Sequence, residues 1–249
     1  MTIEELKIRK KELGFTNEEV AKLADVSLET VEKLFAAIDY CDITYTERFA
    51  IERVLIGLTV DRVEEEVAYL SKKQGEYTAE DFYAFPDDIL VELIDGVIYH
   101  FGTPSVAHQR IISELSYTLK HHVVKNDGKC DVFTSPIAVQ LDCDDKTIVQ
   151  PDILVICDKE KITPQWILGA PDMVVEVLSP STRKYDLTTK MAKYMNAGVR
   201  EYWIVDLEKK RILVYNWVND EFPTIYGFND TVPVGVFDNQ CAVNFYKFI

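Results

Sequence analysis

The hydrophobic pattern of the chain changes near residue 76, and this change constrains the fold more than any other feature. Before it, apolar residues recur at helical spacing, whereas after it short apolar runs alternate with longer helical segments. We therefore predict a helical domain over residues 1–70, a polar linker over residues 71–76 and a second domain over residues 77–249. The length of 249 residues is comfortable for two domains.

The first domain is predicted to be a bundle of short helices. Gly14 separates the first two helices, and Thr16 begins a capping-box pattern that opens the second. Ser27 can cap a third helix, a fourth is expected after Thr46, and residues 60–70 have the apolar spacing of a fifth. The pattern therefore predicts a domain that is almost entirely helical.

The second domain is predicted to be an α/β (α+β) unit in which helices pack on the faces of a sheet. Thr78 can cap a short helix, Asp95-Gly96 has the sequence of a hairpin turn, and Gly198 can end a helix. The expected longer helices cover residues 105–124 and 185–197. The expected strands cover residues 89–94, 97–101, 131–141, 152–156, 172–178, 201–206, 211–217 and 222–228.

The charge of the chain limits how it can bind nucleic acid. It has 27 basic and 42 acidic residues, which give a formal net charge of −15. This charge argues against a protein that coats nucleic acid without sequence preference, because neutralising phosphates requires Lys and Arg. It does not exclude an enzyme that acts on nucleic acid, since a local basic groove or a bound cation can still hold a phosphate.

The sequence shows no feature of a secreted or membrane-spanning protein. It contains no run of about 18 consecutive apolar residues, and its N-terminal segment has no apolar stretch typical of a signal peptide. The five cysteines are scattered and form no C-x-x-C pair. We therefore expect reduced thiols and a cytoplasmic location.

Three acidic residues interrupt apolar strands. Glu92 lies in the run ILVELI, Asp152 opens PDILVI, and Glu176 lies in MVVEVL. An ionised carboxylate in an apolar strand is costly unless it is paired or binds a metal, and carboxylates that converge from neighbouring strands suit Mg²⁺ or Mn²⁺. Each acid taken alone could lie on the exposed face of its strand, but the three together favour a functional site.

The segment after Glu176 adds a basic residue to this set. The chain turns at residues 179–181 and enters a helix in which Asp186, Lys190 and Tyr194 recur every four residues and so share one face. If that face points back at the strand ends, Lys190 places a positive charge near an attacking water or a phosphate. The alternative is a solvated helix with an i,i+4 pair between Asp186 and Lys190.

Several segments of the second domain resemble those of one bacterial family. The resemblance rests on His108 at the head of the long helix, on Asp186, Lys190 and Tyr194, and on the segments ELIDG, QPDI, VVEVLSPST and AGVREYWIVD. With these features the chain resembles the Uma-type restriction endonucleases, which belong to the PD-(D/E)XK nuclease superfamily. The resemblance implies a restriction-endonuclease-like core, in which a central mixed sheet is flanked by helices.

The resemblance also implies roles for individual residues. Asp152 and Glu176 would hold Mg²⁺ or Mn²⁺, and Glu92 would support the metal directly or through a water molecule. The usual motif has a lysine two residues after the glutamate, where this chain has Leu178, and Lys190 on the next helix fits the displaced position. The implied catalytic set is therefore Glu92, Asp152, Glu176 and Lys190, acting in metal-dependent hydrolysis of phosphodiester bonds.

Five further residues are candidates for lining the cleft. His108 matches a family position near the cleft, although a histidine that begins a helix is as often a surface or cap residue. Gln150 and Ser179 could hydrogen-bond the edges of the site, and Asp186 and Tyr194 share the face of Lys190. We expect all five to lie near the acidic residues.

The helical domain resembles the helix-turn-helix of Cro/repressor-type DNA-binding proteins. In that family the helix that starts near Ser27 enters the major groove, so the expected DNA-binding residues are Ser27, Thr30 and Lys33. Glu29 on the same helix would repel phosphate, and residues 1–74 contain 11 basic and 16 acidic residues. The domain could therefore bind DNA, or it could mediate protein contacts or dimerisation.

We expect a Mg²⁺-dependent endonuclease that acts on DNA and, from the resemblance, forms a homodimer. One alternative is a non-catalytic DNA-binding or regulatory protein whose nuclease-like domain mediates oligomerisation. Another is an enzyme that keeps the metal site but acts on a different phosphoester. Replacing Asp152 or Glu176 distinguishes the enzymes from the non-catalytic protein.

Overall fold

The computed structural model describes residues 3–36, 43–56, 72–85, 90–100, 104–141, 144–179, 183–218 and 222–248. The chain divides into two compact units, one formed by Met1–Glu76 with Ile98–His100 and the other by Tyr77–Val97 with Phe101–Ile249. The main division, between residues 76 and 77, lies where the hydrophobic pattern changes.

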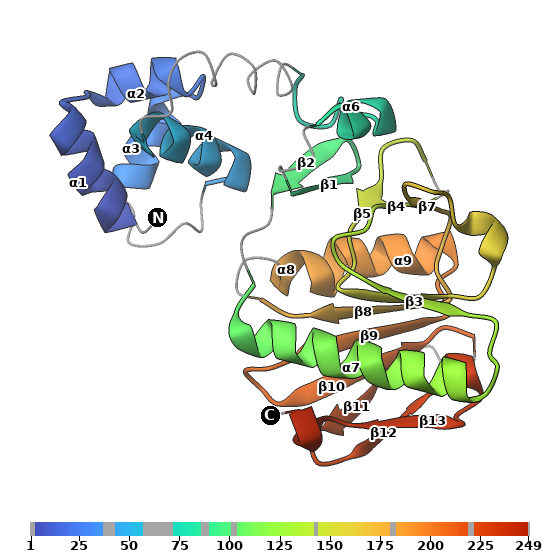
Figure 1. Ribbon diagram of the computed structural model, residues 1–249. Helices are drawn as coiled ribbons and strands as arrows, with labels where there is room; N and C mark the ends of the chain where they lie inside the picture. Colours follow the sequence, from blue (N-terminus) through green and yellow to red (C-terminus); the bar gives the residue numbers. More distant parts are fainter. Residues whose placement is uncertain are drawn as a thin grey trace. The chain divides into compact units, whose positions relative to one another are not determined.

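The described part of the first unit contains the helices α1 (Ile3–Leu13), α2 (Asn17–Leu23), α3 (Leu28–Ala36) and α4 (Tyr45–Ile56) (Figure 1). Thr16 caps α2 as predicted, because its hydroxyl accepts the Glu19 N–H and its own N–H is bound by the Glu19 carboxylate. The helices bury a small apolar core that consists of Ile3, Leu6, Val20, Ala21, Val31, Leu34, Ile51 and Leu55. The fifth helix predicted over residues 60–70 lies outside the described residues.

The second unit contains the helices α6 (Ala79–Ala84), α7 (Val106–Lys125), α8 (Arg183–Tyr185) and α9 (Met191–Ala197). A π-helical turn, η2 (Asp186–Lys190), joins α8 to α9, and Gly198 ends this helical stretch with a φ of 93°. Short 3₁₀ helices are η1 (Lys159–Lys161), η3 (Gly235–Phe237) and η4 (Phe245–Phe248). In the described part of the chain, no helix is both long and apolar enough to cross a membrane.

The main sheet has six strands in the order β11-β10-β9-β8-β6-β3 (Figure 1). These strands are β3 (Asp131–Thr134), β6 (Ile153–Ile156), β8 (Met173–Val177), β9 (Glu201–Asp206), β10 (Arg211–Asn216) and β11 (Thr224–Gly227). Strands β8 and β9 are parallel and the other neighbours are antiparallel. The sheet is therefore mixed, as predicted.

Helices pack on both faces of this sheet. Leu115 and Leu119 of α7 share a buried core with Val175 and Trp203 on one face. On the other face, the ring of Tyr194 in α9 packs against the ring of Tyr202 in β9, with centroids 5.2 Å apart. This layered arrangement confirms the predicted α/β architecture.

A smaller sheet has five strands in the order β2-β1-β5-β4-β7. They are β1 (Val91–Ile94), β2 (Val97–His100), β4 (Val139–Gln140), β5 (Ile148–Val149) and β7 (Ile167–Leu168), and a separate hairpin pairs β12 (Thr231–Val234) with β13 (Cys241–Asn244). The predicted strand over residues 131–141 is wrong as one strand, since β3 and β4 belong to different sheets. Pro136 lies between them and has no N–H to donate to a ladder.

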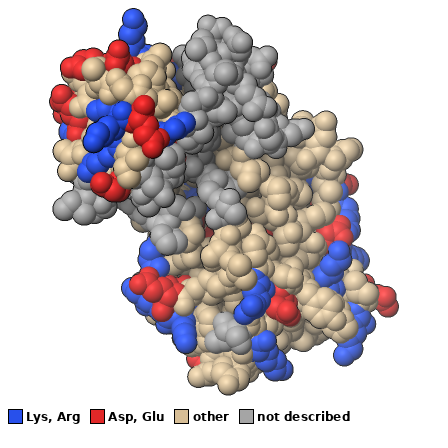
Figure 2. Space-filling model, turned by 60° about the vertical axis from the view of Figure 1, so that its left-hand side comes forward, with Lys and Arg blue, Asp and Glu red and all other residues tan. Residues whose placement is uncertain are grey.

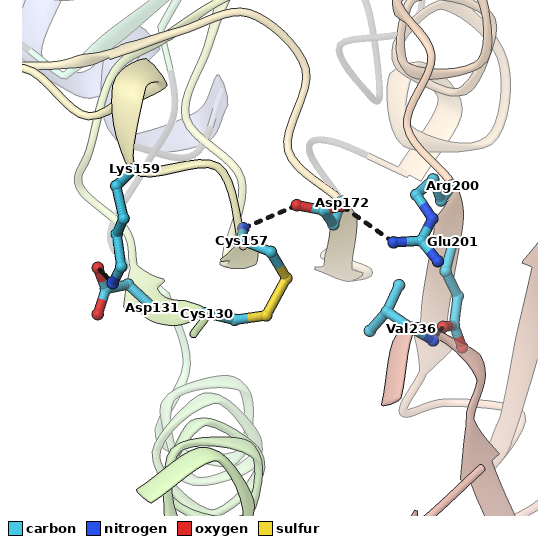
Figure 3. Close-up of a disulfide and its surroundings, with 8 residues drawn as sticks. All are labelled: Cys130, Asp131, Cys157, Lys159, Asp172, Arg200, Glu201 and Val236. Atoms are coloured by element: carbon cyan, nitrogen blue, oxygen red, sulfur yellow. Dashed lines mark hydrogen bonds and ion pairs between the residues drawn. A yellow bond between two sulfur atoms is a disulfide. The ribbon is translucent and has the colours of Figure 1, made fainter. Parts of the chain in front are cut away.

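Cys130 and Cys157 form a disulfide, so the prediction of reduced thiols is wrong for this pair (Figure 3). Cys130 precedes β3 and Cys157 follows β6. The antiparallel register of these strands pairs Asp131 with Ile156, and this pairing brings the two cysteines together. The remaining described free cysteine, Cys241, is buried.

The buried carboxylate of Glu201 connects β9 to the loop that begins η3 (Figure 3). It accepts hydrogen bonds from the N–H groups of Gly235 and Val236, at 3.1 and 2.7 Å, and from Nε1 of Trp203 at 2.7 Å. Three donors satisfy this buried acid, which identifies it as a structural residue rather than a candidate for chemistry.

Candidate active site

Asp152 and Glu176 meet at one end of the main sheet because β6 and β8 run antiparallel. The register pairs Ile153 with Val175, so Asp152, just before β6, lies beside the last residues of β8. Oδ2 of Asp152 accepts a hydrogen bond from the Val177 N–H at 2.7 Å. The two acids that the sequence places far apart are therefore neighbours, and Glu176 is buried.

Glu92 reaches the same place from β1 of the smaller sheet. Its Oε1 accepts the Gln150 N–H at 2.7 Å, and Nε2 of Gln150 donates to the Val91 carbonyl at 2.9 Å. Gln150 stands two residues before Asp152 in the chain. It therefore links the strand that carries Glu92 to the segment that carries Asp152.

Lys190 joins the acids. Its Nζ lies 2.7 Å from Oε1 of Glu176, 2.9 Å from Oε1 of Glu92 and 3.6 Å from Oδ1 of Asp186. Only 4% of the lysine side chain is exposed. The predicted helical face thus points at the strand ends, and the alternative of a solvated i,i+4 pair is wrong, because both Asp186 and Lys190 are buried.

Three carboxylates surround the single ammonium of Lys190, so the charges of this cluster do not cancel. Burial lowers the pKa of Lys190, but the negative charges of Glu176 and Glu92 outweigh it and raise the pKa well above its ordinary value. Burial raises the pKa of Glu176 well above its ordinary value, although Lys190 opposes this effect and Asp186 adds to it. The lysine is therefore charged at neutral pH, and it does not fully compensate its acidic neighbours.

Tyr194 forms a hydrogen bond with Glu176 and does not itself line the cavity. Its hydroxyl donates to Oε1 of Glu176 at 2.7 Å, and both side chains are buried. Burial raises the pKa of Tyr194, so its hydroxyl stays a neutral donor. Tyr202 packs against this ring and donates to the Asp186 carbonyl at 3.0 Å, so that the π-helical turn is anchored to β9.

His108 contacts Asp152 from the first turn of α7. Oγ of Ser105 caps this helix by accepting the His108 N–H at 3.2 Å, and His108 Nε2 lies 3.2 Å from Oδ2 of Asp152. Burial lowers the pKa of His108, but the hydrogen bond to Asp152 and the negative charge of Asp152, together with smaller contributions from Val177 and Asp186, raise the pKa above its ordinary value. Nδ1 is buried without an acceptor among the described residues, so we assign the proton of the neutral ring to Nε2.

A cavity of about 1000 Å³ opens over these groups. Its walls include the predicted residues Glu92, His108, Gln150, Asp152, Glu176, Ser179, Asp186 and Lys190. Tyr194 is not among the residues that line it and instead lies behind Glu176. The structure thus brings the four predicted catalytic residues together, and their catalytic roles stay a prediction.

The cavity wall contains a second charged pair, Arg183 with Asp206, which was not predicted from the sequence. Nη1 and Nη2 of Arg183 donate to the two carboxylate oxygens of Asp206, at 3.3 and 2.7 Å. Burial raises the pKa of Asp206, but the hydrogen bonds from Arg183 and from the Lys209 N–H outweigh it and lower the pKa. Asp206 ends the apolar strand EYWIVD, so the signal that identified Glu176 was also present here.

The three predicted DNA-binding residues lie on or beside α3 in the helical unit. Ser27 Oγ accepts the Thr30 N–H at 3.0 Å, and the Thr30 hydroxyl donates to Glu47 at 3.0 Å. Thr30 is buried, which disfavours contact between its side chain and a base. Lys33 is exposed and forms an ion pair with Glu29 at 2.7 Å.

The arrangement of carboxylate oxygens bears on whether a metal fits. Asp152 uses Oδ2 for both its protein donors, while Glu92 and Glu176 each use Oε1 for both of theirs. Within the described residues, the second oxygen of each acid has no protein donor, and carboxylate oxygens are the donors that Mg²⁺ and Mn²⁺ prefer. Among the described residues, no group of three or more His, Cys, Asp or Glu side chains is arranged to hold a metal ion. Nζ of Lys190 contacts both Glu92 and Glu176.

Comparison with solved structures confirms the fold class. A crystal structure described as a putative nuclease belonging to DUF820, from Anabaena variabilis, superposes with a TM-score of 0.58. It shares 21% sequence identity, and the match covers 69% of this chain and 96% of that one.

Sequence comparison gives the family. The "Uncharacterized protein slr1290" of Synechocystis is 32% identical over 130 residues, which are 52% of this chain and 67% of that protein. The family model Uma2, described as "Putative restriction endonuclease", matches residues 79–237. That range contains the whole cavity wall. It also contains Glu92, Asp152, Glu176 and Lys190, which we call the acid–lysine cluster. The chain therefore belongs to the Uma2 family.

Proposed function

We propose that this protein is an endonuclease that hydrolyses phosphodiester bonds in DNA with the help of Mg²⁺ or Mn²⁺. The observation that carries the proposal is the cluster of Glu92, Asp152, Glu176 and Lys190 in the wall of one cavity, in which Glu92, Glu176 and Lys190 are buried. The family description supports a nuclease, and the chemistry of these side chains supports hydrolysis at a metal site.

Asp152 and Glu176 would hold the cation, and Glu92 would support it. A cation bound there would lower the pKa of a water molecule and stabilise negative charge on the phosphate. Charge balance supports this assignment, because the carboxylates around Lys190 outnumber the cationic side chains that contact them. Hard oxygen donors and an excess of negative charge are what a divalent cation requires.

Lys190 would position a water molecule or a phosphate oxygen rather than remove a proton. Its neighbours raise its pKa well above the ordinary value, so it carries a proton at any pH at which the enzyme would work. Its ammonium would add positive charge where the substrate's phosphate gains negative charge. Of the roles open to the lysine, this geometry favours positioning.

Three other side chains would hold the acids in place. His108 fixes Oδ2 of Asp152, Tyr194 fixes Oε1 of Glu176, and Gln150 fixes Oε1 of Glu92 through its N–H. Each contact orients one oxygen and leaves the other for a further ligand. Such supporting hydrogen bonds set the orientation and basicity of metal ligands.

For the helical unit we propose contact with DNA through α3, where Ser27 and Lys33 are exposed. Acidic and basic side chains lie side by side on the face of this unit drawn in Figure 2, which equally suits contact with a protein or a second copy of the chain. We also propose that the protein forms a homodimer and is located in the cytoplasm. In the cytoplasm, cellular thiols would act on the Cys130–Cys157 bond.

The test compares DNA cleavage by purified wild type with cleavage by Asp152→Asn and Glu176→Gln variants. Both variants keep the shape of the side chain and remove its charge, so we expect Mg²⁺-dependent cleavage of plasmid DNA to fall by about 10² or more. Asp131→Asn is the matched control, since Asp131 is an acid of the same sheet that pairs with Lys159 and lies outside the cavity wall.

Melting curves of all variants would show that the fold is retained. Cleavage that persists unchanged in both active-site variants would exclude the site. Cleavage of RNA in place of DNA would keep the site and change the substrate.

A further inference from the structure

We propose that Arg183 binds a phosphate of the nucleic acid substrate, and that Asp206 holds the guanidinium of Arg183 in place for this contact. The inference deepens the proposed function, on which it rests for the identity of the substrate. It assigns a substrate-binding residue outside the acid–lysine cluster.

The position of Arg183 follows from the parallel pairing of β8 and β9. Val177 pairs with Val205, so the residues that follow the two strands lie together at their carboxyl ends. Asp206 is the last residue of β9, and Arg183 begins α8 shortly after β8. Both line the same cavity as Glu176 and Lys190, so the guanidinium and the acid–lysine cluster belong to one cavity wall.

Asp206 fixes the orientation of the guanidinium. It is fully buried, whereas 28% of the Arg183 side chain is exposed. The two hydrogen bonds between them, at 3.3 and 2.7 Å, form a fork that restricts rotation of the planar group. A surface ion pair would lack this restraint, because both side chains would be mobile.

The guanidinium of Arg183 has more N–H donors than Asp206 accepts. A guanidinium has five N–H donors, and Asp206 accepts two of them, while Glu208 lies 3.6 Å from Nη1. The planar donors of arginine match the oxygen atoms of a phosphate. Asp206 holds one edge of the guanidinium, and within the described residues 28% of the Arg183 side chain is exposed, which is an arrangement that can receive an anion.

The distribution of charged side chains in the cavity wall also favours Arg183 as the phosphate-binding residue. Among the described residues that line it, Lys190 and Arg183 carry the positive charges, apart from His108. The Lys190 ammonium is surrounded by Glu92, Glu176 and Asp186. Arg183 is therefore the cation of the wall that a substrate phosphate can approach without displacing this lysine.

The experiment measures binding of a fluorescein-labelled DNA duplex by anisotropy, with Ca²⁺ in place of Mg²⁺ to limit cleavage. We expect Arg183→Gln to weaken binding by about ten- to a hundredfold, because a hydrogen bond to a charged group is lost. Arg183→Lys keeps the charge and should recover only part of the affinity, and Asp206→Asn should weaken binding less than Arg183→Gln does. Arg200→Gln is the matched control, because Arg200 pairs with Asp172 and does not line the cavity.

A second probe separates a phosphate contact from a structural role. Duplexes that carry one uncharged methylphosphonate, moved along the strand, should reveal a position that weakens binding by the wild type. At that position the Arg183→Gln variant should lose no further affinity. A structural role would instead leave the variant sensitive to the same substitution.

Equal affinities of the Arg183→Gln and Arg200→Gln variants would overturn the inference, as would wild type that does not bind the duplex. The first outcome is independent of the proposed function, which the Asp152→Asn and Glu176→Gln cleavage assays decide, whereas a wild type that does not bind the duplex would also count against DNA as the substrate. A protein that cleaves through Asp152 but binds equally well without Arg183 would keep the function and lose this residue from it.

Discussion

Replacement of Lys190 with methionine should destabilise the second unit by about 3–5 kcal/mol at neutral pH, which is the cost of breaking a buried ion pair by removing one partner. The lysine is 4% exposed and lies within 2.9 Å of carboxylate oxygens of both Glu176 and Glu92. Methionine fills a similar volume, so the loss of charge rather than a cavity would dominate. For a unit of this size the melting temperature should fall by about 6–20 °C.

The pH dependence of this loss follows from Glu176. Burial holds the pKa of Glu176 above its unfolded value, so its contribution to stability is fully present below the unfolded pKa, about 4.3, and is lost as the pH rises toward the folded pKa. Lys190 opposes that rise in pKa, and the Lys190→Met variant lacks this opposition. The loss of stability in the variant should therefore be small at about pH 5, which is close to the unfolded pKa, and larger at about pH 8.

Thermal melts followed by circular dichroism, without divalent cations, would measure the deficit at both pH values. Lys193→Met is the matched control, because Lys193 lies one turn away and its partners Asp95 and Asp144 are more exposed. Its loss should cost no more than about 1 kcal/mol. A Lys190→Met/Glu176→Gln double variant should regain part of the lost stability, since it removes one uncompensated charge.

Two results would contradict this prediction: a Lys190→Met variant with the melting temperature of the wild type near pH 8, or a loss of stability that is the same at both pH values. Either result would mean that the carboxylates are already neutral or solvated in the folded protein.

Three further variants test other contacts. His108→Asn should weaken Mn²⁺ binding, measured by calorimetry, by about 10- to 100-fold, because Asp152 loses a supporting donor; an unchanged affinity would remove His108 from the site. Cys130→Ser/Cys157→Ser should lose about 2–4 kcal/mol in denaturant melts, and dithiothreitol should destabilise the wild type but not this variant. Gly235→Ala should lose about 1–3 kcal/mol, because its Cβ would stand 2.7 Å from Asn216 Nδ2 and 3.1 Å from a Glu201 oxygen; a wild-type melting curve would show that the loop moves freely.

Local patterns in the sequence, together with the family resemblance, predicted the acid–lysine cluster. Glu92 and Glu176 interrupt apolar strands, where a carboxylate is costly unless it has a partner. Lys190 follows at a spacing that puts it on one helical face with Asp186. The structure brings these side chains together, at distances of 2.7 to 3.6 Å from the Lys190 ammonium.

The smaller sheet could not be predicted in the same way. Strands β4, β5 and β7 have two residues each, which is too short for an alternating pattern to be recognised. Their pairing depends on contacts between segments that are distant in the chain. For the same reason the disulfide was missed, since the register of β3 and β6, and not cysteine spacing, brings Cys130 to Cys157.

The pairing of Arg183 with Asp206 shows a different limit of prediction from sequence. Asp206 ends an apolar strand and could have been selected by the rule that selected Glu176, but its partner depends on where the chain goes after β8. The parallel register of β8 and β9 decides this, and no local pattern in the sequence gives it. Local rules therefore identify costly residues, whereas topology determines which of them meet.

The stability of the fold alone does not account for the acid–lysine cluster. Glu201 shows what a structural buried acid looks like here, since three donors satisfy it. Burial raises the pKa of both glutamates, but Glu176 shares the single ammonium of Lys190 with Glu92 and Asp186, so its charge costs folding free energy at neutral pH. Glu176 lines a cavity and keeps one carboxylate oxygen without a donor among the described residues, and the proposed binding of a divalent cation would account for both features. This contrast between two buried glutamates of one sheet is the strongest physical reason to assign chemistry to Glu176.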